Sequence, residues 1–92
     1  MADEQVRRRL IARGRVQGVF FRDSTREQAR AEGVAGWARN RSDGGVEVVL
    51  EGSAEAVDRV AGFIQQGPGS ADVDSVESHD EEPEGLSGFE IR

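Results

Sequence analysis

A glycine-bounded loop is the part of this chain with the clearest capacity for chemistry. Gly14 and Gly18 stand on either side of residues 15–17, and Arg22 follows where a helix is expected to begin. Successive backbone N–H groups in such a loop can converge on an anion, and the N-terminus of the helix adds a partial positive charge. The planar guanidinium of Arg22 can donate two parallel hydrogen bonds to phosphate oxygens. The loop therefore indicates a phosphate site, although a tight connection with a surface arginine explains the same pattern equally well.

The composition excludes several other kinds of catalytic site. The chain contains no Lys, so the loop is not a nucleotide-binding loop of the Walker type, which ends in Gly-Lys and a hydroxyl residue. It contains no Cys, which excludes thiol catalysis, a disulfide scaffold and Cys-ligated zinc. The single histidine, His79, cannot form a multi-histidine metal site within one chain. The remaining chemistry uses Arg, carboxylates, amides and backbone groups, and we expect no cofactor and no metal.

Two segments of the chain resemble the signature motifs of the acylphosphatase family. Residues 14–22 (GRVQGVFFR) resemble the first motif, and residues 33–40 (GVAGWARN), followed by residues 43–44 and 46–47, resemble the second. Residues 89–92 (FEIR) are similar to the C-terminus of the family. The resemblance covers nearly the whole chain. It implies a ferredoxin-like fold and metal-independent hydrolysis of the carboxyl–phosphate bond of acyl phosphates.

The resemblance also implies roles for individual residues. Arg22 is expected to bind the phosphate and Asn40 to hold the attacking water, which makes these two the implied catalytic residues. The implied phosphate loop consists of Arg15, Val16, Gln17, Gly18, Val19, Phe20 and Phe21. Considered without the resemblance, Asn40 stands before a hairpin turn and is more typical of a turn residue. No strong base lies in either motif, so the phosphate of the substrate is expected to take the proton of the water.

Four further residues lie in or beside these motifs. Asp23 either adds negative charge beside the anion site or caps the helix, and Arg41 stands where the family often has Thr. We expect Phe20 and Phe21 to anchor the loop by burying their rings on either side of it.

The segments around these residues predict the elements that position them. Alternation predicts a strand over residues 6–14, with its arginines on a solvated edge. A capping box, Ser24 with Glu27 three residues later, predicts a helix from about 22–24 to 32, and Gly33 suits the position after its end. Residues 34–40 and 46–51 predict a hairpin, with Glu47 and Glu51 facing outward.

The second half of the chain has one strong helical pattern. Ser53 is a predicted N-cap, and apolar residues follow at helical spacing: Val57, Val60, Ala61 and Ile64. Residues 71–79 predict a weaker strand in which Val73 and Val76 are out of step by one, and a short strand closes the chain near Phe89. The order predicts an α+β fold, the ferredoxin-like βαββαβ sandwich. Its antiparallel sheet carries two helices on one face and a short extra C-terminal strand, in a single domain over residues 1–92.

The charge of the chain is uneven along its length. The formal net charge is −6, from 12 arginines and 18 acidic residues. Ten of the arginines lie in residues 1–41 and thirteen of the acids in residues 42–92. We interpret the basic half as an anion site and the acidic half as a solvated surface. The acidic excess and the absent Lys indicate adaptation to high salt, and a genome that favours Arg over Lys explains them as well.

Two function classes remain open from the residues: an enzyme that hydrolyses acyl phosphates, and a binding module that recognises RNA or a small anion without turnover. RNA-binding versions of this fold carry aromatic residues on the central strands. Here those strands carry Leu10, Ile11 and a run of valines, which disfavours nucleic acid. Because the chain begins and ends with the domain, we do not expect it to be a non-catalytic part of a larger protein.

No apolar stretch approaches the roughly 20 residues that cross a bilayer, and the start of the chain is acidic. We expect a cytoplasmic monomer that acts on a small molecule and binds no membrane.

Overall fold

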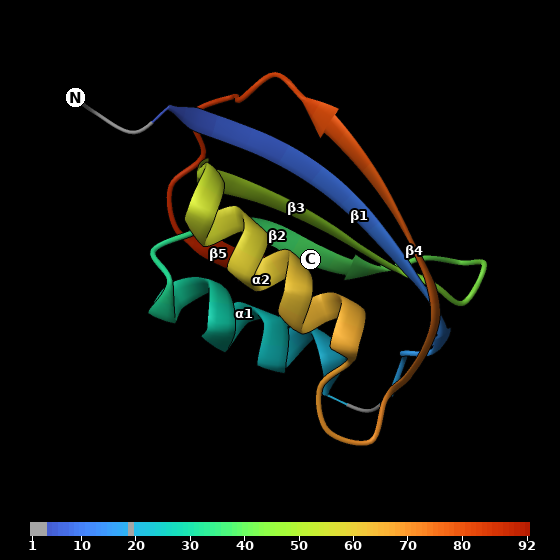
Figure 1. Cartoon of the computed structure of the whole chain (residues 1–92). Helices are drawn as coiled ribbons and strands as arrows, with labels where there is room; N and C mark the ends of the chain where they lie inside the picture. Colours follow the sequence, from blue (N-terminus) through green and yellow to red (C-terminus); the bar gives the residue numbers. More distant parts are fainter. Residues whose placement is uncertain (1–3, 19) are drawn as a thin grey trace.

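One mixed sheet and two helices make up the part of the chain that the computed structural model describes, residues 4–18 and 20–92. The elements follow in the order β1 (Gln5–Arg15), α1 (Phe21–Ala31), β2 (Ala35–Asn40), β3 (Val46–Ser53), α2 (Ala54–Gln66), β4 (Asp72–Glu81) and β5 (Phe89–Ile91). The strand order in the sheet is β4-β1-β3-β2-β5, and both helices cover one face (Figure 1). This confirms the ferredoxin-like α+β fold.

The sheet differs from the prediction at one edge. The pairs β4–β1, β1–β3 and β3–β2 are antiparallel, as expected. The C-terminal strand β5, however, pairs with β2 in parallel. After β4 the chain crosses from one edge of the sheet to the other and then runs in the direction of β2, so the sheet is mixed.

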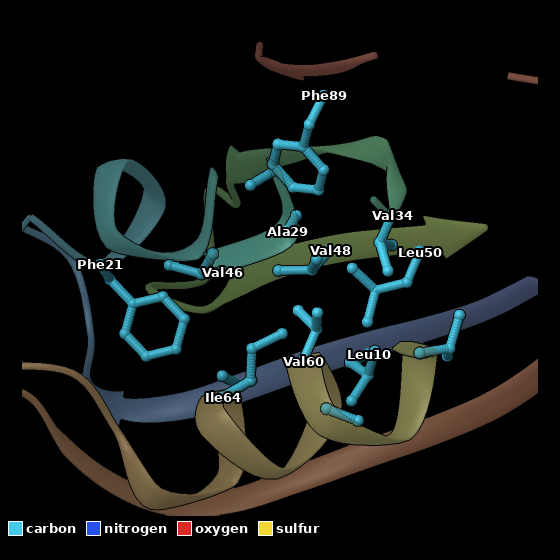
Figure 2. Packing of buried hydrophobic residues seen from close by; sticks show 14 of the residues in the cluster. Leu10, Phe21, Ala29, Val34, Val46, Val48, Leu50, Val60, Ile64 and Phe89 are labelled. Atoms are coloured by element: carbon cyan, nitrogen blue, oxygen red, sulfur yellow. The ribbon is translucent and has the colours of Figure 1, made fainter. Parts of the chain in front are cut away.

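The hydrophobic core lies between the sheet and the two helices (Figure 2). The apolar stripe predicted on α2 is buried there, together with Leu10 of β1 and alternate residues of β3. Figure 2 shows the ring of Phe21 on the same side of the sheet as Val46 and Ile64. Because Phe21 is the first residue of α1, its burial fixes where the glycine-bounded loop ends and the helix begins.

The C-terminal end of α1 agrees with the prediction, but its N-terminal cap does not. The helix begins at Phe21, and its N-cap residue is Phe20, whose side chain makes no capping hydrogen bond. The N–H of Ser24 donates to the carbonyl of Phe20 at 3.0 Å, so Ser24 lies within the first turn and the predicted capping box is wrong. At the other end, the N–H of Gly33 donates to Arg30 and that of Val34 to Ala29, which is a Schellman motif with Gly33 at φ 70°.

A bulge explains why Val73 and Val76 are out of step in β4. Arg13 pairs with Ser75 and Gly14 pairs with Val73, so the residue between the two β4 partners has no counterpart in β1. Such an extra residue shifts the alternation by one and brings both valines to the same face. A Cβ on Gly14 would stand 2.3 Å from a backbone carbonyl oxygen of β4, and the φ of 124° also favours glycine.

The face of the sheet opposite the helices is covered by ion pairs, which the alternation did not reveal. Arg7, Glu47 and Glu51 are each only 4% exposed. The guanidinium of Arg7 donates to Glu51 at 2.7 Å and to Glu81 at 2.8 Å. The prediction of a solvated edge is therefore wrong for Arg7, and the outward-facing Glu47 and Glu51 are buried. β1 is an inner strand between β3 and β4, so its side chains have acidic neighbours on both sides.

Trp37 lies on this same face. Its ring is 7% exposed and stands below the guanidinium groups of Arg9, Arg39 and Arg92, at 4.8–5.7 Å from the ring centroid. Cations over an aromatic face are attracted by its quadrupole. Trp37 is thus buried sheet packing, with arginines as its cover.

Candidate active site

Three elements bring the predicted site residues to one end of the sheet. β1 and β2 both run antiparallel to β3, so they point in the same direction and finish at the same end of the sheet (Figure 1). Val46 pairs with Ala12 of β1 on one side and with Asn40 of β2 on the other. Residues that pair directly across strands share a face, so Asn40 belongs to the helix-covered face on which Ala12 and Val46 are buried. The start of α1 lies at this end as well (Figure 1).

Two residues of the loop between β1 and α1 have a left-handed backbone, a conformation that occurs in anion-binding turns. Gly18 has a φ of 75° and Phe20 a φ of 59°, and left-handed residues within such a turn direct successive N–H groups toward one concavity. No side chain caps α1 in the described part of the chain, so its first N–H groups keep their capacity to donate. A pocket of about 220 Å³ lies here, and its lining is Val16, Gly18, Phe20, Phe21, Arg22 and Asp23.

Arg22 differs from the other arginines in its partners. Ten of the twelve arginines form ion pairs: Arg7, Arg8, Arg9, Arg13, Arg15, Arg26, Arg39, Arg41, Arg59 and Arg92. Arg30 instead donates to the carbonyl of Phe89 at 3.3 Å. Among the described residues, no carboxylate or carbonyl accepts a hydrogen bond from half-buried Arg22. Its five donors are therefore available to a ligand in the pocket that it lines.

The remaining predicted loop residues lie in different environments. Arg15 is 62% exposed and turns away from the loop, because its guanidinium donates to the carbonyl of Ser70 and pairs with Asp72 at 3.3 Å. Val16 is buried and fixes the start of the loop in the core. Val19 lies outside the described residues.

Only one of the two phenylalanines behaves as predicted. Phe21 is 2% exposed and anchors the loop, whereas Phe20 is 77% exposed. Phe20 is also the one residue other than glycine with a positive φ among the described residues. The expectation that both rings are buried is therefore wrong for Phe20, which has a left-handed backbone and a ring in solvent.

Gln17 has a role that the sequence did not reveal. Its side-chain Nε2 donates to the carbonyl of Arg41 at 2.9 Å and to the carbonyl of Gly45 at 2.8 Å. Both carbonyls belong to the turn that directly follows Asn40. The side chain of Gln17 thus ties the loop to the strand end that carries Asn40. The spacing of residues along the chain gives no sign of such a contact, since its partners are 24 and 28 positions away.

The turn itself is organised around Asp43. Its carboxylate accepts hydrogen bonds from Arg41, from the N–H of Gly45 and from Arg13 of β1. These donors hold the pKa of the Asp43 carboxyl well below its usual value, with Arg41 as the largest cause. Asp43 is therefore ionised at neutral pH, and it fixes the two ends of the turn that Gln17 holds.

The described residues contain no cluster of three or more acidic or histidine side chains that could hold a metal ion. No helix in this part of the chain is long and apolar enough to span a membrane.

Comparisons with known proteins agree with the geometry. A family model described as acylphosphatase matches residues 8–91. The chain belongs to the acylphosphatase family. It is 51% identical over 92 residues to an acylphosphatase from Rubrobacter xylanophilus, with 99% of this chain and 84% of the relative covered. It is 45% identical to one from Natronomonas pharaonis, with 97% of each chain covered. The crystal structure of the acylphosphatase from Bacillus subtilis superimposes with a TM-score of 0.91 at 33% identity, covering 95% of this chain and 98% of that one.

Two charged residues, Arg41 and Asp23, lie near the candidate site. Arg41 pairs with Asp43 at 3.0 Å and approaches Glu47 on the far face of the sheet, so its charge is directed away from the pocket. Asp23 makes no capping hydrogen bond and pairs with Arg26 at 3.5 Å. The negative charge of Asp23 therefore stays beside the pocket, partly balanced by Arg26.

Proposed function

We propose that the protein hydrolyses the carboxyl–phosphate bond of acyl phosphates without a metal, with Arg22 and the loop backbone holding the phosphate and Asn40 orienting the water. The observation that carries this proposal is the position of Arg22. It lines a pocket at the N-terminus of an uncapped helix and has no acceptor among the described residues. An arginine that has no acceptor among the described residues and lies beside the N–H groups at the start of a helix is suited to a phosphate dianion.

The reaction needs charge stabilisation more than acid–base help. In the displacement, the water oxygen forms a bond to phosphorus, and the bond from phosphorus to the acyl oxygen breaks. The carboxylate leaves with the electron pair, and a phosphate oxygen takes the proton of the water. Charge in the transition state is spread over the three equatorial phosphate oxygens. Fixed donors aimed at those oxygens, here the guanidinium of Arg22 and the loop amides, act without reorganising during the reaction.

Asn40 supplies the remaining function in this mechanism. Its carbonyl can accept a hydrogen bond from the water while its amide donates to the phosphate or to backbone. Support for this role comes from its place at the end of β2, on the face that the start of α1 covers, and from the Gln17 contacts that hold the turn behind it. Such positioning converts the attack of water into an effectively unimolecular step.

The test is hydrolysis of benzoyl phosphate in the presence of a chelator. The reaction is measured by the release of inorganic phosphate. We expect turnover that is unchanged by the chelator. Binding of phosphate without any turnover would instead establish the binding module, and turnover that needs added metal would contradict the proposed mechanism.

Two substitutions test the individual roles. Arg22→Ala is expected to abolish most turnover and to weaken inhibition by phosphate, and Asn40→Ala to lower kcat while phosphate inhibition persists. Arg30→Ala is the matched control for Arg22, because it removes the same charge from the same helix about 12 Å away. Ser42→Ala, in the turn beside Asn40, is the control for the second. Full kcat in Asn40→Ala would remove the water-positioning role.

The proposal also covers partners and location. We infer one domain over residues 1–92 that acts as a monomer on small molecules in the cytoplasm. Its support is the sheet face opposite the helices, where ion pairs and a covered Trp37 leave no exposed aromatic ring for nucleic-acid bases, and the absence of Cys. Sedimentation at several concentrations, titration with single-stranded RNA and fractionation of the source cells test these three points.

A further inference from the structure

Phe20 combines a left-handed backbone with a ring that is exposed to solvent. Its φ of 59° is the left-handed conformation, in which a side chain crowds the following carbonyl oxygen. All the other positive φ values in the described residues belong to glycines. Its ring is 77% exposed, the one large apolar side chain in that part of the chain given to solvent to this extent. The neighbouring Phe21 already anchors the loop, so the ring of Phe20 adds little to the core.

The position of the ring gives it a use in binding. Phe20 and Arg22 line the same pocket, on either side of the buried Phe21. In an acyl phosphate the acyl carbon is separated from phosphorus by a single oxygen. A phosphate held at Arg22 therefore brings the group attached to the acyl carbon to the rim of the pocket.

We propose that the exposed ring of Phe20 is an apolar platform for the acyl group, so that this protein prefers aromatic or other apolar acyl phosphates to small ones. The inference rests on the proposed function, because it takes Arg22 and the loop as the phosphate site. Strained backbone conformations cluster at active sites and ligand clamps, where the strain is part of the function. Aromatic rings also bind apolar groups with specific offset-stacked or edge-to-face geometry.

The test compares kcat/KM for benzoyl phosphate with kcat/KM for acetyl phosphate in the wild type and in Phe20 variants. Phe20→Asn and Phe20→Gly both remove the ring and both tolerate a left-handed backbone. Phe20→Leu keeps an apolar side chain on the same strained backbone and is the matched control. The ratio between the two substrates cancels any damage to the loop that lowers both rates.

We expect the preference for benzoyl phosphate to fall about three- to tenfold in the Asn and Gly variants, the range given by a single aromatic contact, and to fall less in the Leu variant, which keeps apolar area but loses the ring. The loss should appear in the KM for benzoyl phosphate, because a contact remote from phosphorus is made equally in the ground state and the transition state.

The outcomes separate this inference from the proposed function. Hydrolysis of either substrate by the wild type establishes the activity whatever the ratio. A ratio in Phe20→Asn within about twofold of the wild-type ratio, well below one aromatic contact, would overturn the platform and leave the activity standing. Equal losses with both substrates, accompanied by weaker inhibition by inorganic phosphate, would also overturn it, because they would show that Phe20 acts only on the shape of the loop.

Discussion

The contact between Gln17 and the turn after Asn40 leads to a specific prediction about catalysis. The two hydrogen bonds from Gln17 Nε2, at 2.9 Å to Arg41 and 2.8 Å to Gly45, are the side-chain connection between the loop and that turn. Gln17→Ala removes both bonds and leaves the residues that face the pocket unchanged. Gln17→Glu keeps the size of the side chain but replaces the donor with an oxygen that faces two carbonyl oxygens.

The structure allows the size of the effect to be estimated. Each lost hydrogen bond is worth about 1 kcal/mol, so Gln17→Ala should lower the free energy of unfolding by about 1–2 kcal/mol. The effect on catalysis should be larger, because a displacement on the order of 1 Å between reacting groups costs up to about 100-fold in rate. We therefore expect kcat to fall about 10- to 100-fold, with Gln17→Glu at least as impaired as Gln17→Ala.

The assay measures kcat with benzoyl phosphate and the inhibition constant of inorganic phosphate. The phosphate constant should change far less than kcat, because phosphate is held by Arg22 and loop amides rather than by the Gln17 side chain. Ser53→Ala is the control for stability. Ser53 caps α2, its hydroxyl accepts from the N–H of Ala56 at 3.3 Å, and loss of such a cap costs about 1 kcal/mol.

Comparison of Gln17→Ala with Ser53→Ala decides whether Gln17 positions the water. If Gln17→Ala is folded and its kcat stays within about twofold of the kcat of Ser53→Ala, a difference of only about 0.4 kcal/mol, then the Gln17 hydrogen bonds do not position the water. A fall in kcat matched by an equal loss of phosphate affinity would also refute it, since it would show that the loop itself has collapsed.

Three further predictions concern the ion pairs and the charge. Glu51→Ala should lower the free energy of unfolding by about 3–5 kcal/mol in urea melts, because Arg7 loses its buried partner, and Glu51→Gln should cost less because it keeps an acceptor oxygen. Stability should be constant above about pH 5 and fall as the pH drops, because the folded carboxyls titrate below the usual Glu pKa of roughly 4.3. For Glu81, hydrogen bonds from Arg9 and Arg7 lower the pKa to about 2; equal stability at pH 7 and pH 3 would contradict this. Adaptation to salt predicts that stability rises from low to molar KCl, and a flat or falling titration would count against it.

The pKa of Glu51 has the same direction for a related reason. Burial alone would raise it, but hydrogen bonds from the N–H of Glu84, from Arg7 and from the N–H groups that follow Glu84 outweigh burial and lower it. The folded value lies below the unfolded value. The stabilisation from Glu51 is therefore present above the unfolded pKa and is lost as the pH falls through the folded one.

Local patterns were sufficient to predict most of the fold. The helical stripe of α2, the Ser53 cap and the alternation of β3 depend on residues close together in the chain, and the structure has them where the sequence indicates. The Ser24 capping box was wrong for a physical reason. The burial of Phe21 moves the N-cap from the predicted Ser24 to Phe20, because core packing outweighs a cap worth about 1 kcal/mol.

The sequence predicted the residues of the phosphate loop, but not the hydrogen bonds that join this loop to the turn after Asn40. The glycine pattern and Arg22 indicated the phosphate loop. In contrast, the hydrogen bonds from Gln17 to the turn and the exposed ring of Phe20 depend on long-range contacts and backbone conformation, which the spacing of residues along the chain does not reveal. Arg7 and Glu51 were assigned to an open face for the same reason: alternation reports which face a side chain occupies, but not whether long-range ion pairs cover that face.

The two oppositely charged halves of the chain pair with each other in the folded structure. The arginines of β1 pair with acids from the second half of the chain: Arg7 with Glu51, Arg8 with Asp58 and Arg13 with Glu77. The basic half is therefore largely neutralised within the fold and does not, as a whole, form an anion site. Charges farther than a screening length of roughly 10 Å act weakly at ordinary salt. A chain of net charge −6 can thus hold a phosphate dianion, because the field in the pocket comes from Arg22 and the helix N-terminus and not from the total.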